Sequence, residues 1–256
     1  MDKQLIDIIR KAGEIILQEK RPEVFTKEGH ANFVTQTDIN VQDFLKEKLS
    51  VYLPQASFFA EEQENNVLDD GLCFMIDPID GTANYMRGRN FSCVSVALLK
   101  DKQPVLGLIF NPFSDELFLA EQEKGATLND KKIKASEVEF ENAIINFGTS
   151  PYYPEKAQAT FEICKKLIKV SGDLRRTGSA ALDLAELACG RTDLFFELSL
   201  SPWDYAAGAL IAKEAGAIFD MPLLDKIDFS QKTCILAGNK LCFDKAKDII
   251  QEHCHD

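Results

Sequence analysis

The chain has 256 residues and a formal net charge of -12 at pH 7, with 45% hydrophobic and 27% charged residues. A chain of this length and composition can bury a substantial core, which excludes an intrinsically disordered protein. Its acidic balance argues against nonspecific binding to nucleic acids or to acidic membranes, because both need clusters of Lys and Arg.

The first half of the chain begins with two predicted helices. Residues 3–20 carry apolar side chains at helical spacing interrupted by charges, whereas a secretory signal would be continuously apolar. A second amphipathic helix is predicted over residues 34–53, starting at Thr35 or Thr37. No stretch approaches the roughly 18 apolar residues of a membrane span, so we expect a cytoplasmic protein.

Five short apolar stretches then predict an antiparallel meander of strands: SFFA from residue 57, LCFMI from 72, SCVSVALL from 92, VLGLIF from 105 and ELFLA from 116. The second half alternates instead. Strands are predicted at 143–148, 193–198 and 234–238, and helices at 154–169, 179–190, 201–216 and 240–253.

This order of elements predicts a mixed α+β and α/β architecture, a layered sandwich of helices and two sheets. We expect a single domain over residues 1–256, with an α+β subdomain over 1–140 and an α/β subdomain over 141–256, since no flexible linker separates them.

The seven cysteines predict neither a disulfide framework nor a zinc site, because they are scattered and never form a C-x-x-C pair. The terminal tripeptide His253-Cys254-His255 is interpreted as a frayed tail rather than as a metal site.

The stretch LCFMIDPIDGTANY places two carboxylates where a strand is predicted to end. A turn alone would explain Asp, Pro and Gly there. Three further acidic segments also lie at predicted element ends. Each has an ordinary explanation: the helix dipole for Asp38, a solvated strand end for Glu61-Glu62, and a capping box, S-x-x-D, for Asp204.

Together these segments are better explained by a hard divalent cation. Mg²⁺ prefers carboxylate oxygens with water and substrate phosphate, and the chain has no matching His/Cys cluster. Gly81 would let the backbone approach a ligand closely, and amides that open a helix after Thr82 can bind phosphate oxygens. The sequence therefore predicts a phosphatase.

Three segments, Glu61-Glu62, Asp77-Pro-Ile-Asp-Gly-Thr82 and Trp203-Asp204-Tyr-Ala-Ala-Gly208, resemble the signature segments of the inositol monophosphatase family. The resemblance runs along essentially the whole chain. It implies the α-β-α-β-α sandwich of the lithium-sensitive sugar phosphatases, a homodimer, and a small phosphate monoester as partner. The antiparallel sheet of the first subdomain would then carry most of the metal ligands.

The resemblance also implies two to three Mg²⁺ ions and their ligands. Glu61, Asp77 and the carbonyl of Ile79 would hold the first ion. Asp77, Asp80 and Asp204 would hold the second, so that Asp77 bridges both, and a third, weaker ion is expected near Glu61.

Catalytic and binding roles follow from the same resemblance. Thr82, with Asp38 behind it, would orient a metal-bound water that Glu61 helps to deprotonate, and the amides of Gly81 and Thr82 would bind phosphate. Glu197 and the loop Gly178-Ser179-Ala180 would line the pocket for inositol hydroxyls. Lys27 would lie in a mobile catalytic loop. Ala60 departs from the glycine that usually precedes the glutamate pair, and Ala83 from the residue that often follows the threonine.

The expected reaction is hydrolysis of inositol 1-phosphate by in-line attack of water, inhibited by lithium. A phospho-aspartate mechanism would need D-x-D, and an EF-hand would need D-x-D-x-D-G, but the chain has D-x-x-D. Fructose 1,6-bisphosphate, histidinol phosphate and NADP stay open as substrates. A different class also stays open, a dimeric regulatory protein that binds the transcription or translation machinery.

Overall fold

The structure is a computed structural model that describes residues 2–19, 22–27, 29–30 and 32–254. The predicted frayed tail is wrong for His253 and Cys254, which lie in the last turn of a helix over Phe243–Cys254, and His255 lies outside the described residues. Among the described residues, no helix has the length and apolar character needed to cross a membrane.

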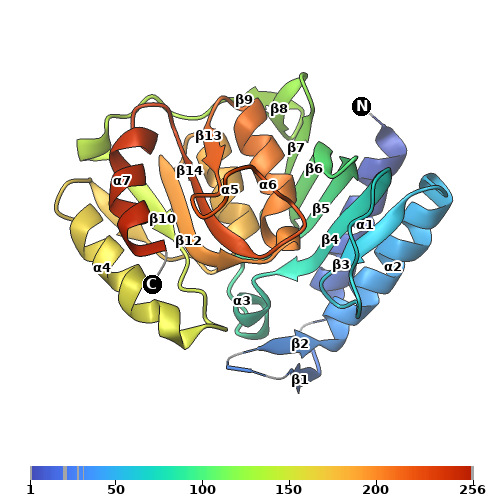
Figure 1. The fold of residues 1–256 in the computed structure, drawn as a ribbon. Coiled ribbons are helices and arrows are strands. Elements are labelled where there is room, and N and C mark those ends of the chain that lie inside the picture. The colour runs from blue at the N-terminus through green and yellow to red at the C-terminus, as the bar shows by residue number, and fades with distance from the viewer. Residues whose placement is uncertain (1, 20–21, 28, 31, 255–256) are drawn as a thin grey trace.

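Five layers of helix and sheet make up the fold (Figure 1). The first layer holds α1 (Lys3–Gln18) and α2 (Gln36–Tyr52), which pack on a seven-stranded sheet of order β3-β4-β5-β6-β7-β8-β9. The strands of this sheet are β3 (Ser57–Ala60), β4 (Leu72–Asp80), β5 (Cys93–Lys100), β6 (Gln103–Asn111), β7 (Glu116–Glu121), β8 (Gly125–Leu128) and β9 (Lys131–Ile133).

The middle layer, α5 (Ala180–Ala188) and α6 (Pro202–Glu214), lies between the two sheets. The second sheet has the order β11-β10-β12-β14-β13, and α4 (Ala157–Leu167) and α7 (Phe243–Cys254) cover its outer face. Its strands are β10 (Ile144–Phe147), β11 (Asp173–Arg175), β12 (Leu194–Leu200), β13 (Ile218–Asp220) and β14 (Thr233–Gly238). The predicted α-β-α-β-α sandwich is therefore confirmed.

Three apolar cores join these layers. One lies between the first helical layer and the seven-stranded sheet, a second lies between the sheets around α5 and α6, and a third lies under α4 and α7. The central core draws residues from both halves of the chain, so the two halves share apolar packing around α5 and α6.

The helix boundaries follow from local chemistry. Helix α1 buries Ile9, Ala12 and Ile16 and ends at Gln18, two residues before its predicted end, because Glu19 is extended. At the start of α2, the Asp38 carboxylate accepts from the Thr35 amide at 2.8 Å, and the Asp38 amide donates to the Thr35 hydroxyl at 3.3 Å. This reciprocal capping box makes Thr35, rather than Thr37, the cap.

The predicted meander needs two corrections. Strand β3 runs parallel to β4, whereas every pairing from β4 to β9 is antiparallel. Strand β4 does not end before Pro78 but continues to Asp80, with a register irregularity against β5 between Asp77 and Asp80. An irregularity of this kind tolerates proline, which cannot donate to a regular ladder.

Several short elements had no clear signal in the sequence. The hairpin of β1 (Val24–Thr26) and β2 (Phe33–Thr35) precedes α2, and the five-residue helix α3 (Thr82–Met86) follows β4. In Figure 1 the hairpin lies below α3, at the same edge of the molecule. The hairpin carries Lys27 directly after β1, so it brings this side chain to Glu61 at the carboxyl end of β3.

Candidate active site

Three aspartates converge from two elements that belong to different layers. Asp77 and Asp80 come from the end of β4, and Asp204 comes from the first turn of α6. One carboxylate oxygen from each lies within 4.8 Å of the others. Asp77 and Asp80 are buried, and Asp204 is half-buried. This acidic cluster is the set that the sequence predicted for the second metal ion.

At the end of β4, hydrogen bonds fix the backbone as well as the carboxylates. The Ile79 amide donates to Asp77 at 3.0 Å, and the Ile79 carbonyl accepts from the Thr82 hydroxyl at 3.1 Å. Gly81 then turns the chain with φ of +88°. A Cβ there would lie 3.1 Å from the Phe91 carbonyl oxygen and 3.2 Å from that of Gly178, so the turn needs glycine both for its φ and for its close contacts.

Asp80 is fixed by the start of α5. One of its oxygens accepts from the Ser179 hydroxyl at 2.5 Å and from the Ala181 amide at 2.7 Å. The resemblance predicted that Ser179 lines the substrate pocket, and the structure adds that its buried hydroxyl holds a cluster carboxylate. Ser179 therefore positions Asp80 within the acidic cluster.

Asp204 caps α6 and also belongs to the acidic cluster. Its carboxylate accepts from the Ser201 amide at 2.8 Å, which caps α6, and the same side chain belongs to the acidic cluster. The capping explanation is correct, but it does not replace the metal-site explanation. The cap fixes the carboxylate at the point where α6 begins.

Asp38 and Thr82 form a buried pair beside the cluster. The Thr82 hydroxyl lies 3.2 Å from one Asp38 oxygen, while the other oxygen accepts from the Thr35 amide and hydroxyl. Burial raises the pKa of Asp38 to about 6, although the hydrogen bonds from Thr35 oppose this shift. The structure thus brings Asp38 behind Thr82, as the sequence predicted.

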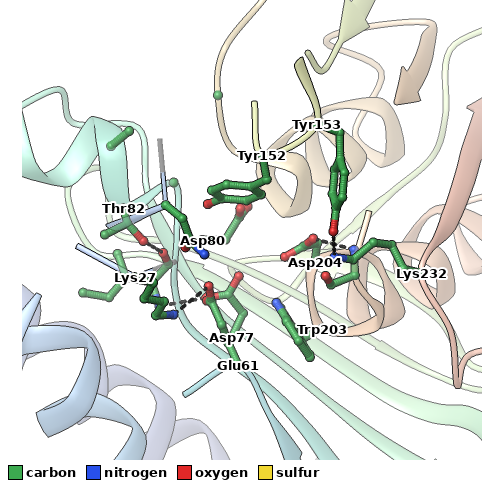
Figure 2. A pocket seen from close by; sticks show the side chains of 16 residues that line it. Lys27, Glu61, Asp77, Asp80, Thr82, Tyr152, Tyr153, Trp203, Asp204 and Lys232 are labelled. Atoms are coloured by element: carbon green, nitrogen blue, oxygen red, sulfur yellow. Dashed lines mark hydrogen bonds and ion pairs between the residues drawn. The ribbon is translucent and has the colours of Figure 1, made fainter. Parts of the chain in front are cut away.

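Glu61 directly follows the last residue of β3 and lies beside Asp77 (Figure 2). The Lys27 ammonium is 3.7 Å from Glu61 and 2.5 Å from Glu62. Burial raises the pKa of Glu61 to about 7, although Lys27 opposes the shift. Burial also works to lower the pKa of Lys27, but the two glutamates outweigh it, so this pKa is raised. Ala60 lies within β3 with no positive φ, so this position tolerates its methyl group.

The acidic cluster is electrostatically strained when no cation is bound. Burial raises the pKa of Asp77 well above its usual range, and repulsion from Glu61, Asp80 and Asp204 raises it further. Burial followed by repulsion from Asp80 and Glu61 does the same for Asp204. A hard divalent cation would relieve this repulsion, and ligands that are all oxygen suit Mg²⁺. The residues present therefore fit a magnesium site.

We expect Mg²⁺ to raise the melting temperature more at about pH 8 than at about pH 5. The pKa of Asp80 is raised to about 6 by burial, and that of Glu61 to about 7. In metal-free protein, Asp80 and Glu61 keep their protons in the folded state at pH values where they have lost them in the unfolded state. Protonation of these two groups therefore stabilises the folded state less and less as pH rises from about 4 to about 7, and this contribution stays low above pH 7.

Thermal unfolding with Mg²⁺ or with a chelator, at both pH values, measures this difference. The Asp80→Asn variant should reduce the pH dependence of the magnesium effect. An equal magnesium shift at both pH values in the wild-type protein would contradict the electrostatic account.

The predicted substrate residue Glu197 lies in a small inner cavity of about 80 Å³ that adjoins the cluster. One Glu197 oxygen accepts from the Ser150 amide at 2.7 Å, and a Cβ on Gly148 would lie 1.8 Å from the other. Burial raises the pKa of Glu197 to about 7, against the Ser150 hydrogen bond and the charge of Arg176. Gly178, Ser179 and Ala180 line the same cavity, as the resemblance implied.

The main cavity, of about 290 Å³, contains every predicted metal ligand. It also has an outer wall that the sequence analysis did not identify, made by Asn32, Tyr152, Tyr153, Ser201 and Lys232. The two tyrosines follow β10, a parallel strand whose carboxyl end faces the site. Their place after a parallel strand could have indicated a position at the site, because ligands bind at the carboxyl ends of such strands. Lys232 had no signal in the sequence.

Comparison with known proteins adds the family. A model described as the inositol monophosphatase family matches residues 1–253. The chain belongs to the inositol monophosphatase family. Membership supports a magnesium-dependent phosphatase that acts on small phosphate substrates, and it confirms the resemblance found in the sequence.

Among curated relatives, inositol monophosphatase 3 of Solanum lycopersicum is 41% identical over 226 residues, which cover 84% of each chain. Nus factor SuhB of Xylella fastidiosa is 34% identical over 257 residues, covering 93% of this chain and 91% of that protein.

Among solved structures, extragenic suppressor protein suhB from Bartonella henselae has a TM-score of 0.89 at 33% identity, with 96% of each chain covered. An IMPase/NADP phosphatase complexed with Mg²⁺ and phosphate has a TM-score of 0.87 at 25% identity, covering 97% of this chain and 94% of that one. The fold and the family thus agree. Some relatives are named phosphatases and others Nus factor or suppressor protein, so the substrate has to be inferred from the residues of the site.

Proposed function

We propose that the protein is a magnesium-dependent phosphomonoesterase that hydrolyses inositol monophosphate. The observation that carries the proposal is the convergence of the buried acidic cluster with the Asp38–Thr82 pair and the Gly81 turn in one cavity. Attack by water in line with the leaving oxygen needs no nucleophilic side chain, and the D-x-x-D spacing agrees with that mechanism.

Glu61, Asp77 and the Ile79 carbonyl would hold one Mg²⁺, and Asp77, Asp80 and Asp204 a second, for two to three ions in all. Bound Mg²⁺ would polarise the phosphate ester, lower the pKa of water and stabilise the departing alkoxide. Each of these carboxylates lines the main cavity, and backbone or hydroxyl donors fix three of them in place.

Thr82 and Asp38 would orient the attacking water. Because the Thr82 hydroxyl donates to Asp38 or to the Ile79 carbonyl, its oxygen is left to accept a hydrogen bond from water. Glu61, which lines the same cavity, would accept the proton that water loses. Thr82 and Asp38 would thus position the water, and Glu61 would act as the general base.

The turn at Gly81 would bind the phosphate group. Its positive φ opens α3 directly after the cluster, and the amides of Gly81 and Thr82 would donate to the phosphate oxygens. The inner cavity with Glu197 and the loop from Gly178 to Ala180 would contact polyol hydroxyls, since a carboxylate accepts hydrogen bonds from neutral OH groups.

The proposal also includes the remaining expectations of the family resemblance. The protein would be a cytoplasmic homodimer, inhibited by lithium, with neither nucleic acid nor membrane as partner. Lys27, in the segment after β1, would belong to a mobile catalytic loop that contacts Glu61.

The first test is magnesium-dependent release of phosphate from inositol 1-phosphate. We expect Asp80→Asn to lower kcat about 100-fold, because the variant keeps the side-chain shape but removes one ligand charge. Asp130→Asn is the matched control, since Asp130 is exposed in a turn with a φ of +64° that asparagine tolerates. Turnover by Asp80→Asn equal to that of the control would reject the two-metal assignment.

A second candidate is a regulatory protein, because one relative that is 34% identical is named a Nus factor. A panel of substrates separates the two candidates: inositol 1-phosphate, fructose 1,6-bisphosphate, histidinol phosphate and NADP, each with Mg²⁺. Release of phosphate from any of them supports the enzyme. No release from any would favour the binding protein, which must then be tested for association with transcription components.

A further inference from the structure

A tyrosine stands at the boundary between the main cavity and the inner cavity. Four of the described residues line both cavities: Asp80, Tyr152, Gly178 and Asp204. Asp80 and Asp204 belong to the acidic cluster, and Gly178 has no side chain. Tyr152 is therefore the bulky side chain of this boundary that has no part in the cluster. Figure 2 shows its ring projecting into the main cavity, and 44% of the residue is exposed.

A tight turn fixes the backbone of Tyr152. The Tyr153 amide donates to the Ser150 carbonyl at 2.8 Å, which closes a β-turn over residues 150–153. Pro151 is the second residue of this turn and Tyr152 the third. Proline is favoured at the second position because its ring already holds the φ that the turn requires. The turn therefore presents the Tyr152 ring from a backbone with little conformational freedom.

Ser150 anchors this turn to the end of β12. It is buried, its hydroxyl donates to the Ser199 carbonyl at 3.3 Å, and the same hydroxyl accepts from the Ser199 amide at 3.0 Å. The Ser150 amide also donates to Glu197 at 2.7 Å. One residue thus holds both the Glu197 carboxylate of the inner cavity and the turn that carries Tyr152, so the two are fixed relative to each other.

A substrate that reaches from one cavity into the other must pass Tyr152. Its phosphate would lie at the acidic cluster, and its hydroxyls would reach Glu197 and Arg176, which line the inner cavity. A six-membered polyol ring carries hydroxyls around its rim and C–H groups on its faces, and an aromatic ring packs well against such a face. Burial and the charges of Glu61 and Asp204 raise the pKa of Tyr152, so this side chain stays neutral and adds no charge to the boundary.

We propose that Tyr152 selects substrates whose leaving group is a ring, by packing its aromatic ring on one face of the polyol while the acidic cluster and Glu197 hold the two ends. This inference rests on the proposed phosphatase function and adds a specificity-determining residue to it. An acyclic leaving group has no face of this kind, so it gains little from Tyr152.

The test compares kcat/KM for inositol 1-phosphate with kcat/KM for glycerol 2-phosphate, an acyclic monoester, with Mg²⁺ present. Tyr152→Ala should lower the ratio of the two about 10-fold, mainly through KM for inositol 1-phosphate, because only the cyclic substrate loses a packing partner. Tyr152→Leu, which keeps apolar volume without a flat ring, should lower the ratio about 3-fold. Tyr152→Phe should leave the ratio within about 2-fold of the wild-type value, since the aromatic ring stays.

Phe161→Ala is the matched control, because it removes an aromatic ring that is exposed on α4 and lines neither cavity. Its ratio should equal that of the wild type, and melting temperatures show whether each variant is folded. A Tyr152→Ala ratio equal to that of Phe161→Ala overturns ring selection, even if both rates fall, and leaves the phosphatase intact. A Tyr152→Phe ratio as low as that of Tyr152→Ala also overturns it, because the hydroxyl would then be responsible. Failure of the wild-type protein to hydrolyse either monoester rejects the proposed function and this inference with it.

Discussion

Replacing Asp77 with asparagine should reduce kcat for inositol 1-phosphate by about 10³-fold or more, equivalent to about 4 kcal/mol of transition-state stabilisation. Asp77 is the only side chain assigned to both metal ions, and it lies at the centre of the acidic cluster with 2% of its surface exposed. The substitution preserves size and the ability to accept from the Ile79 amide. Steady-state phosphate release with saturating Mg²⁺ measures the effect.

Stability separates this loss from unfolding. Burial and repulsion from Glu61 raise the pKa of Asp77, so the ionised group opposes folding when no metal is bound. In metal-free buffer above neutral pH, Asp77→Asn should therefore melt at a higher temperature than the wild type. A variant that keeps more than about a tenth of the wild-type kcat would show that Asp77 does not bridge two ions.

Gly81→Ala should lower kcat about 100-fold and destabilise the fold by about 1–3 kcal/mol. An alanine at φ of +88° is strained, and its Cβ would lie 3.1 and 3.2 Å from two backbone carbonyl oxygens, of Phe91 and Gly178. These carbonyls belong to the segments that hold the cluster, so they cannot shift without moving the amides proposed to bind phosphate. Thermal unfolding and phosphate release measure the two effects.

The matched control is Gly216→Ala. Gly216 has a φ of +90°, but a Cβ added there would meet no atom of the described residues within 4 Å, so this position carries the backbone strain without the contacts. The control should destabilise the fold less than Gly81→Ala and leave kcat near the wild-type value. Equal losses of stability and activity in both variants would mean that the close packing at Gly81 has no role in the site.

Much of the site could be predicted because its chemistry is local in sequence. Asp77, Ile79, Asp80 and Thr82 lie within six residues, and this stretch indicated a metal site once the other acidic segments and the family resemblance were considered with it. Asp204 gave two signals at once, a cap and a ligand, and the structure shows that both interpretations fit the same carboxylate. The roles of these residues in binding metal stay proposals that the variants test.

Other features depend on contacts between distant segments, which a single sequence does not reveal. Ser179 holds Asp80 across 99 residues of chain, and Lys232 meets Tyr153 across 79. The continuation of β4 past Pro78 was missed because proline usually ends a strand, whereas here the ladder with β5 is irregular at that point. The hairpin that carries Lys27 was missed because its strands have only three residues each.

Calorimetric titration of Mg²⁺ into the metal-free protein tests the central claim most directly, because it needs no knowledge of the substrate. The wild type should bind two or more ions per chain, Asp80→Asn one fewer, and Asp77→Asn none with comparable affinity. A wild-type isotherm without magnesium binding, or an Asp77→Asn isotherm that matches the wild type, would contradict the assignment of the acidic cluster as the metal centre.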